Sequence, residues 1–290
     1  MAGTDYKHIR VTPNKDGFGA RIDGIQDVSA MSPEQLIEVK QAFALHSVIC
    51  FPDQPLSLQQ QEDFTRQFGA FGVDPYIVPM EQHPNILELR REPDEKAPNF
   101  GAGWHSDWSF QPEPPAVTIL HSKVTPPIGG DTLFCDCYRA YEDLSPVFQT
   151  FLDTLTAAHT AALPYGRNGL YAGETGKRSM KIIASEEAEK LFNHPLVRVH
   201  PETRRKALFV GPIYTSGIVG MAETESKAVL AFLYDHMLQD RYIYRHKWQP
   251  GMVLMWDNRC TLHYADGGYD GHLRVMHRTT VAGEKPLAAS

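Results

Sequence analysis

The sequence has no run of apolar residues long enough to cross a lipid bilayer, and its first residues contain no apolar core of signal-peptide length. It has only four cysteines, none in a CxxC spacing, so we expect buried thiols in a reducing compartment. The formal net charge is −7 and no basic run is present, which disfavours nucleic acid and anionic membranes as partners. We therefore expect a cytoplasmic protein that holds any anionic ligand with individually placed arginines.

Helix and strand signals alternate without a regular βα repeat. Ser32 with Gln35, and Ser57 with Gln60, form helix-capping signals that predict helices towards Leu45 and Gly69. Two further helices are predicted over residues 138–155 and 222–237. Strands are predicted over residues 47–51, 117–120, 132–135, 207–210, 242–248, 252–256 and 273–281.

Many strands separated by Pro and Gly turns predict a mainly β protein, with a closed or sandwiched antiparallel core and flanking helices. We expect residues 1–290 to form a single domain. Two segments look too irregular for the core, namely residues 92–103 and residues 163–177. Such long loops are either lids over a functional site or plain surface insertions.

The most informative stretch is Trp104-His105-Ser106-Asp107-Trp108, which places an imidazole and a carboxylate two residues apart. On a β-strand these two side chains point to the same face, so they could bind one metal ion together. In a chain with 13 histidines, a His-x-Asp match also occurs by chance, as a surface His beside a solvated Asp. A distant histidine, for which His263 is the best candidate, would complete a facial triad with open positions suited to Fe(II).

Other motifs follow in order: Gly129-Gly130-Asp131-Thr132, then the stretch from Met255 to His263 that contains Trp-Asp-Asn-Arg, then Arg274 and Arg278, which are 11 and 15 residues after His263. Together with the His-x-Asp stretch, this ordered set resembles the taurine dioxygenase and dichlorophenoxyacetate dioxygenase family of Fe(II)/α-ketoglutarate oxygenases. The resemblance spans most of the chain from about Ile22. It implies a double-stranded β-helix, or jelly roll, core.

The resemblance also implies a site. His105, Asp107 and His263 would bind Fe(II), while Arg274 and the Thr132 hydroxyl would bind the far carboxylate of α-ketoglutarate, for which Arg offers a bidentate fork. Arg274 could instead form a structural ion pair with an aspartate. With O2, such an enzyme converts the cosubstrate to succinate and CO2. Hydroxylation of the substrate is the default outcome, and desaturation or oxidative decarboxylation of an amino-acid-derived substrate occurs in related enzymes.

Arg278 matches the arginine that binds the substrate's sulfonate or carboxylate in the two named enzymes, so a small anionic substrate is expected. The His and Asn donors of the taurine pocket are replaced here by Asp74 and Gly101, which favours a carboxylate over a sulfonate. Asp74 would accept from an amine or hydroxyl, or cap a turn before Pro75. The expected apolar walls, each of which could equally be ordinary core, are Tyr76, Trp108 and Tyr214, with Trp256 near the iron.

Two other readings of these residues remain open. A zinc hydrolase would use the same ligands but would have no use for the Thr132 and Arg274 pair. A non-catalytic metal-binding jelly roll would be expected to lose a ligand or an anchor, and all five are present. The family often forms dimers or tetramers, so a homo-oligomer is expected.

Overall fold

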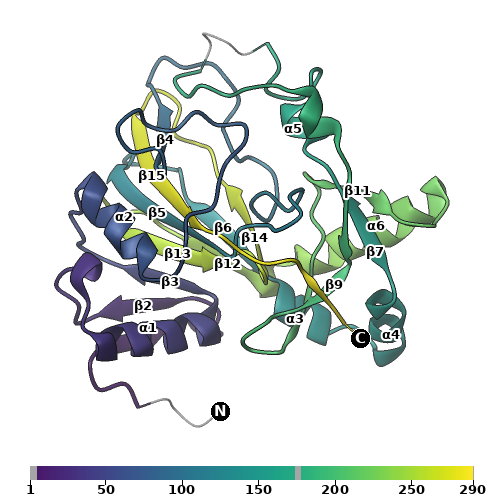
Figure 1. The fold of residues 1–290 in the computed structure, drawn as a ribbon, viewed down its shortest axis with the longest axis horizontal. Helices are drawn as coiled ribbons and strands as arrows, with labels where there is room; N and C mark the ends of the chain where they lie inside the picture. The colour runs from purple at the N-terminus through teal and green to yellow at the C-terminus, as the bar shows by residue number, and fades with distance from the viewer. Residues whose placement is uncertain (1–4, 174–177, 290) are drawn as a thin grey trace.

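The computed structural model describes residues 5–173 and 178–289, and β-strands dominate it (Figure 1). The largest layer is a seven-stranded sheet in the order β1-β2-β3-β13-β5-β15-β4. Its neighbouring strands are antiparallel except for β2 and β3, which are parallel. The strands are β1 (Arg10–Pro13), β2 (Ala20–Asp23), β3 (Val48–Phe51), β13 (Val253–Asp257), β5 (Val117–Val124), β15 (Arg274–Val281) and β4 (Leu87–Arg91).

A second sheet faces this layer and consists of β12 (Ile243–His246), β6 (Thr132–Asp136) and β14 (Thr261–Ala265), with β6 in the centre. Side chains from both sheets pack together in one buried cluster. In that cluster the ring centroids of Phe134 on β6 and Trp256 on β13 lie 5.4 Å apart. Two facing sheets of this kind form the predicted jelly-roll arrangement, and over the described residues they do not close into a barrel.

The central strands are apolar on both faces, as the continuous apolar run at residues 47–51 predicted. Val48 and Cys50 point into the space between the two sheets, whereas Ile49 and Phe51 point to the opposite face. On that opposite face they pack against the helices α1 (Pro33–His46) and α2 (Leu58–Arg66). Both sides of the large sheet are therefore covered near its centre.

Both predicted capping boxes are present. Ser32 accepts from the Gln35 backbone N–H at the start of α1, and Ser57 accepts from the Gln60 backbone N–H at the start of α2. The end of the second helix was predicted too late, because α2 stops at Arg66 and a turn follows before Gly69.

The prediction of one helix over residues 138–155 is wrong. The segment forms two helices, α3 (Cys137–Glu142) and α4 (Pro146–Asp153). Pro146 lacks a backbone N–H, and its ring would clash with the preceding turn of a continuous helix, so it occupies the first turn of α4 instead. The helix α6 (Glu223–Met237) follows the prediction and buries Leu230, Leu233 and Met237.

The remaining elements include short strands that the sequence patterns did not predict. Two three-stranded sheets have the orders β10-β9-β16 and β11-β7-β8. Every helix of the described chain is too short or too polar to cross a bilayer. All four cysteines are buried and unpaired. The elements are β7 (Thr156–His159), β8 (Phe192–Pro195), β9 (Val197–Val199), β10 (Lys206–Leu208), β11 (Thr215–Ile218), β16 (Leu287–Ala288), α5 (Ala162–Tyr165) and the 3-10 helices Val28–Ala30, Glu186–Glu189 and Asp240–Tyr242.

The two segments predicted as lids meet each other. Residues 92–103 contain no helix or strand, and the second segment begins within α5, while residues 174–177 of that prediction lie outside the described residues. The rings of Phe100 and Tyr171 are 5.5 Å apart, and the Gly101 backbone N–H points at the Tyr171 hydroxyl at 3.5 Å. The contact places both segments beside one cavity, described next.

Candidate metal centre and active site

His105, Asp107 and His263 converge, although His105 and Asp107 do not share a strand as the sequence suggested, while His263 lies on β14. His105 forms an isolated β-bridge with His263, through N···O distances of 3.1 and 2.8 Å, and Asp107 lies in the turn that follows. That turn includes Trp108 with φ of +44°. One donor atom from each of the three side chains lies within 4.8 Å of the others, and all three side chains are buried.

The protonation of these side chains suits a divalent cation. The Nδ1 of His105 lies 2.6 Å from the Gly103 carbonyl oxygen and donates a hydrogen bond to it. The lone pair of the other ring nitrogen, Nε2, is then available to a metal, and this atom is 3.6 Å from Asp107 Oδ1. Burial and the neighbouring His105 lower the pKa of His263 to about 3. Burial opposes ionisation of Asp107, but the Arg278 guanidinium and the two imidazoles hold its pKa below the ordinary range. The cluster thus offers the Nε2 atom of His105, a neutral imidazole at His263 and one anionic oxygen of Asp107.

A chain of hydrogen bonds fixes Asp107 from behind. The Oδ2 of Asp107 accepts from the Thr118 hydroxyl at 2.6 Å. The oxygen of that hydroxyl accepts in turn from the Asn258 side-chain amide at 2.8 Å. The Asn258 Oδ1 accepts in turn from the Trp256 indole at 3.0 Å. Only one carboxylate oxygen of Asp107 therefore faces the two histidines. Neither Thr118 nor Asn258 was predicted as a site residue, although Asn258 belongs to the Trp-Asp-Asn-Arg motif.

The rest of that motif forms a buried ion network at the turn between β13 and β14. Asp257 accepts from the Arg259 guanidinium at 2.7 Å and from His200 Nε2 at 3.0 Å. Burial disfavours the charge of Asp257, but these two partners keep its pKa below the usual range. The network anchors the turn that contains Asn258 and leads into β14, the strand that carries His263.

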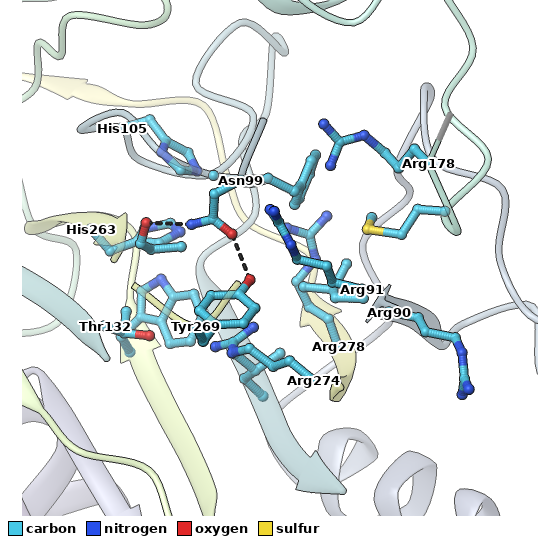
Figure 2. Close-up of a pocket in the computed structure, with 17 residues that line it drawn as sticks. Arg90, Arg91, Asn99, His105, Thr132, Arg178, His263, Tyr269, Arg274 and Arg278 are labelled. Carbon is cyan, nitrogen blue, oxygen red and sulfur yellow. Dashed lines mark hydrogen bonds between the residues drawn. The ribbon is translucent and has the colours of Figure 1, made fainter. Parts of the chain in front are cut away.

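A cavity opens between His105 and His263 on one side and the arginines of β15 and β4 on the other (Figure 2). Arg274, on β15, is buried in its wall, and its Nη2 donates to the Gly130 carbonyl at 3.4 Å. Within the described chain no carboxylate pairs with Arg274, and its Nε has no hydrogen-bond partner. Burial lowers its pKa below that of an ordinary arginine. Such an uncompensated buried cation is unfavourable unless an anion binds beside it.

Thr132 also lines the cavity, and its hydroxyl accepts from the Trp248 indole at 2.9 Å. The hydroxyl hydrogen is therefore left for another acceptor. Sequence patterns missed Tyr269, whose ring lies against both the Arg91 and Arg274 guanidiniums at 5.4 and 5.7 Å. The Tyr269 hydroxyl donates to Asn99 Oδ1 at 2.6 Å, which ties the first lid segment to this wall (Figure 2).

Arg278 lines the cavity as well, but it already has acidic partners. Its Nη2 is 2.9 Å from Asp74 Oδ2, and its Nη1 is 3.5 Å from Asp107 Oδ1. Asp74 also caps its turn, because Oδ1 accepts from the Tyr76 and Ile77 backbone N–H groups at 2.7 and 2.9 Å. Asp74 therefore caps a turn, as one of its two alternatives in the sequence predicted, and also forms an ion pair with Arg278.

The other predicted pocket residues lie behind the cavity. In the part of the chain that is described, none of Asp74, Tyr76, Trp108 and Tyr214 is among its lining residues. Trp108 packs under the Arg278 guanidinium at 4.9 Å, and Tyr214 meets the His105 ring edge-on at 5.7 Å. Trp256, expected near the metal, does line the cavity, with its ring 4.7 Å from that of His263.

Comparisons with known proteins agree with this arrangement. The chain is 33% identical over 264 residues to an α-ketoglutarate-dependent 2,4-dichlorophenoxyacetate dioxygenase of Cupriavidus pinatubonensis, covering 85% of this chain and 88% of that one. It is 32% identical over 274 residues to an alkylsulfatase of Acinetobacter baylyi, covering 94% and 84%. A solved taurine dioxygenase of Burkholderia xenovorans superposes with a TM-score of 0.81 at 29% identity, covering 98% and 94%.

The jelly-roll prediction and the family resemblance are both confirmed by these matches. A family model described as taurine catabolism dioxygenase TauD, TfdA family matches residues 9–280, which include every element of the site. The chain therefore belongs to the TauD/TfdA family of dioxygenases.

Proposed function

We propose that the protein is an Fe(II)- and α-ketoglutarate-dependent dioxygenase that hydroxylates a small organic substrate bearing an acidic group. The observation that carries this proposal is that two members of the three-donor cluster, His105 and His263, line one cavity together with the buried guanidinium of Arg274, which has no carboxylate partner among the described residues. The cluster suits a metal with free positions, and the guanidinium suits a carboxylate.

His105, Asp107 and His263 would hold Fe(II), which supplies O2 activation coupled to oxidation of α-ketoglutarate to succinate and CO2. The protein's own contribution is to position these groups. Gly103 orients the His105 ring, and Thr118 restricts Asp107 to one ligating oxygen. Positions on the cavity side of the cluster are thereby left for cosubstrate and O2.

Arg274 would bind the far carboxylate of α-ketoglutarate, and the Thr132 hydroxyl would donate to the same group. The guanidinium is held in place by Gly130 and by the Tyr269 ring, so little further ordering is needed on binding. Its position in a buried wall also excludes water from the anion.

The acidic substrate is proposed from the relatives, whose names include a dichlorophenoxyacetate dioxygenase and an alkylsulfatase. Gly101, which lines the cavity, offers no side-chain donor for a sulfonate, so we favour a carboxylate. Hydroxylation adds one oxygen to the product, whereas desaturation removes two hydrogens, and the mass of the product distinguishes them.

Two rival functions make different demands on the same residues. A zinc hydrolase would leave Arg274 buried without a partner, which is costly. A non-catalytic jelly roll would gain nothing from keeping both the metal donors and this guanidinium. We also propose a cytoplasmic homo-oligomer, to be tested by cell fractionation and light scattering.

The proposal is tested by loading the protein anaerobically with Fe(II) and α-ketoglutarate, then admitting O2 and screening small carboxylates, sulfonates and amino acids for succinate release. We expect a subset of carboxylates to stimulate succinate formation in the presence of Fe(II). Turnover of an ester with Zn(II) and no keto acid would instead support the hydrolase.

A further inference from the structure

The Arg278–Asp74 pair is built into the fold. The two side chains are 5% and 3% exposed, and Asp74 is held by two backbone N–H groups as well as by the guanidinium. The Trp108 ring covers the face of Arg278. An anion that approached Arg278 from the cavity would meet a cation whose charge Asp74 already balances.

The charges around the metal cluster also sum to zero without a substrate. Asp74 and Asp107 contribute two negative charges, and Arg274 and Arg278 contribute two positive charges. Fe(II) and the α-ketoglutarate dianion would again cancel each other. A further anion placed at Arg278 would therefore be buried without compensation, which a low-dielectric site strongly disfavours.

Arg91 offers an anion a different kind of contact. It lines the same cavity, and its partner Asp270, at 2.8 Å, is 87% exposed. Figure 2 shows the Arg91 guanidinium directed into the cavity and that of Arg90 directed away from it. A ligand carboxylate could replace Asp270, because that side chain can return to water at little cost.

We propose that Asp74 fills the anion-binding position of Arg278, and that the acidic group of the substrate is bound by Arg91 instead. This inference rests on the proposed function for its substrate. It makes Asp74 the residue that determines where an anion can bind. It also leaves the remaining N–H groups of Arg278 for an uncharged acceptor on the substrate, including Nε, which has no hydrogen-bond partner among the described residues.

The test locates an anion directly. Crystals of the protein with Mn(II) and N-oxalylglycine, an unreactive α-ketoglutarate analogue that would occupy Arg274, are soaked in selenate, and the selenium is located by anomalous scattering. We compare the wild type with Asp74→Asn, which keeps an oxygen to accept from the turn N–H groups. Asp74→Ser keeps a similar acceptor and serves if the first variant fails to fold. Glu92→Gln is the matched control, since it removes one negative charge from the partner of Arg90 at the same cavity.

We expect a selenium peak at Arg91 and none at Arg278 in the wild type and in Glu92→Gln, and a new peak at Arg278 in Asp74→Asn. A wild-type peak at Arg278, a missing peak at Arg91, or no new peak in Asp74→Asn would each overturn the proposal. Failure of N-oxalylglycine or Mn(II) to bind would instead count against the proposed function. The selenium positions at Arg91 and Arg278 would still test the present proposal.

A kinetic arm uses an acidic substrate found in the succinate screen. Arg91→Gln should raise its KM at least about tenfold with kcat less affected, and the affinity for N-oxalylglycine should be unchanged. Arg66→Gln, which removes an exposed arginine paired with Asp63 on α2 and outside the cavity, is the control and should leave KM within about twofold of wild type. Equal effects of the two substitutions would contradict the assignment of Arg91.

Discussion

Replacing Thr118 by Val tests whether the hydrogen-bond chain behind Asp107 prepares the metal site. Valine keeps the shape of the side chain and removes only the hydroxyl that donates to Asp107 Oδ2 at 2.6 Å and accepts from Asn258 at 2.8 Å. Thr118 is fully buried on β5, so water cannot easily replace the lost group. Both of its partners would be left unsatisfied.

The expected loss can be worked out from these two contacts. A hydrogen bond to a charged group contributes about 1.5–3 kcal/mol, and a buried amide left without its acceptor costs about 1–3 kcal/mol. The free energy of unfolding of the metal-free protein should therefore fall by roughly 2.5–6 kcal/mol. The loss will be smaller if the Asn258 amide turns towards another acceptor. Because Oδ2 of Asp107 is no longer restrained, metal affinity should fall about 10- to 100-fold.

The measurements are urea denaturation of the metal-free protein and anaerobic titration with Mn(II). Thr118→Ser is the control, because it restores the hydroxyl in a smaller side chain and should recover most of the metal affinity. If Thr118→Val bound Mn(II) as tightly as wild type, then the hydrogen bond to Asp107 would have no part in preparing the site.

The remaining predictions concern the metal, the cosubstrate and pH. His105→Ala should abolish succinate release while far-ultraviolet circular dichroism stays unchanged, and residual turnover above about 1% of wild type would count against its role as a ligand. Arg274→Ala should weaken α-ketoglutarate binding, measured by calorimetry, by roughly 2–5 kcal/mol, and Thr132→Val by less; equal affinity of the Arg variant and wild type would refute the assignment. Burial lowers the pKa of His159 to about 3 and that of His246 to about 4. Below about pH 6.5 these two imidazoles therefore become protonated in the unfolded state but stay neutral in the folded state. The free energy of unfolding should therefore fall as the pH drops from about 6.5 to 4, by up to about 1.4 kcal/mol per pH unit for each histidine, and a flat urea-denaturation profile over this range would contradict the burial of neutral imidazoles.

Local signals in the sequence predicted several elements well. The Ser32 and Ser57 capping boxes mark the starts of α1 and α2, because a cap depends on residues only three positions apart. The apolar run at residues 47–51 predicted a strand covered on both faces. The single helix predicted over residues 138–155 is interrupted before Pro146, a residue type that disfavours the interior of a helix.

The site residues could be predicted from the sequence only where they belong to a short sequence motif. His105 and Asp107 were paired by a strand argument that the structure does not support, since a turn and a bridge to His263 bring the side chains together. The Arg278–Asp74 pair joins residues 204 positions apart, and no local pattern specifies such a contact. Thr118 was unpredictable for the same reason, because its position on a buried strand says nothing about which carboxylate it meets.

The most direct test of this account is a crystal structure of the protein with Mn(II) and N-oxalylglycine. It should show one metal within about 2.0–2.3 Å of His105, Asp107 and His263, the range typical of nitrogen and oxygen ligands. The far carboxylate of N-oxalylglycine should lie within hydrogen-bond distance of Arg274 and Thr132. A metal bound elsewhere, or an analogue carboxylate that leaves Arg274 without a partner, would contradict the account.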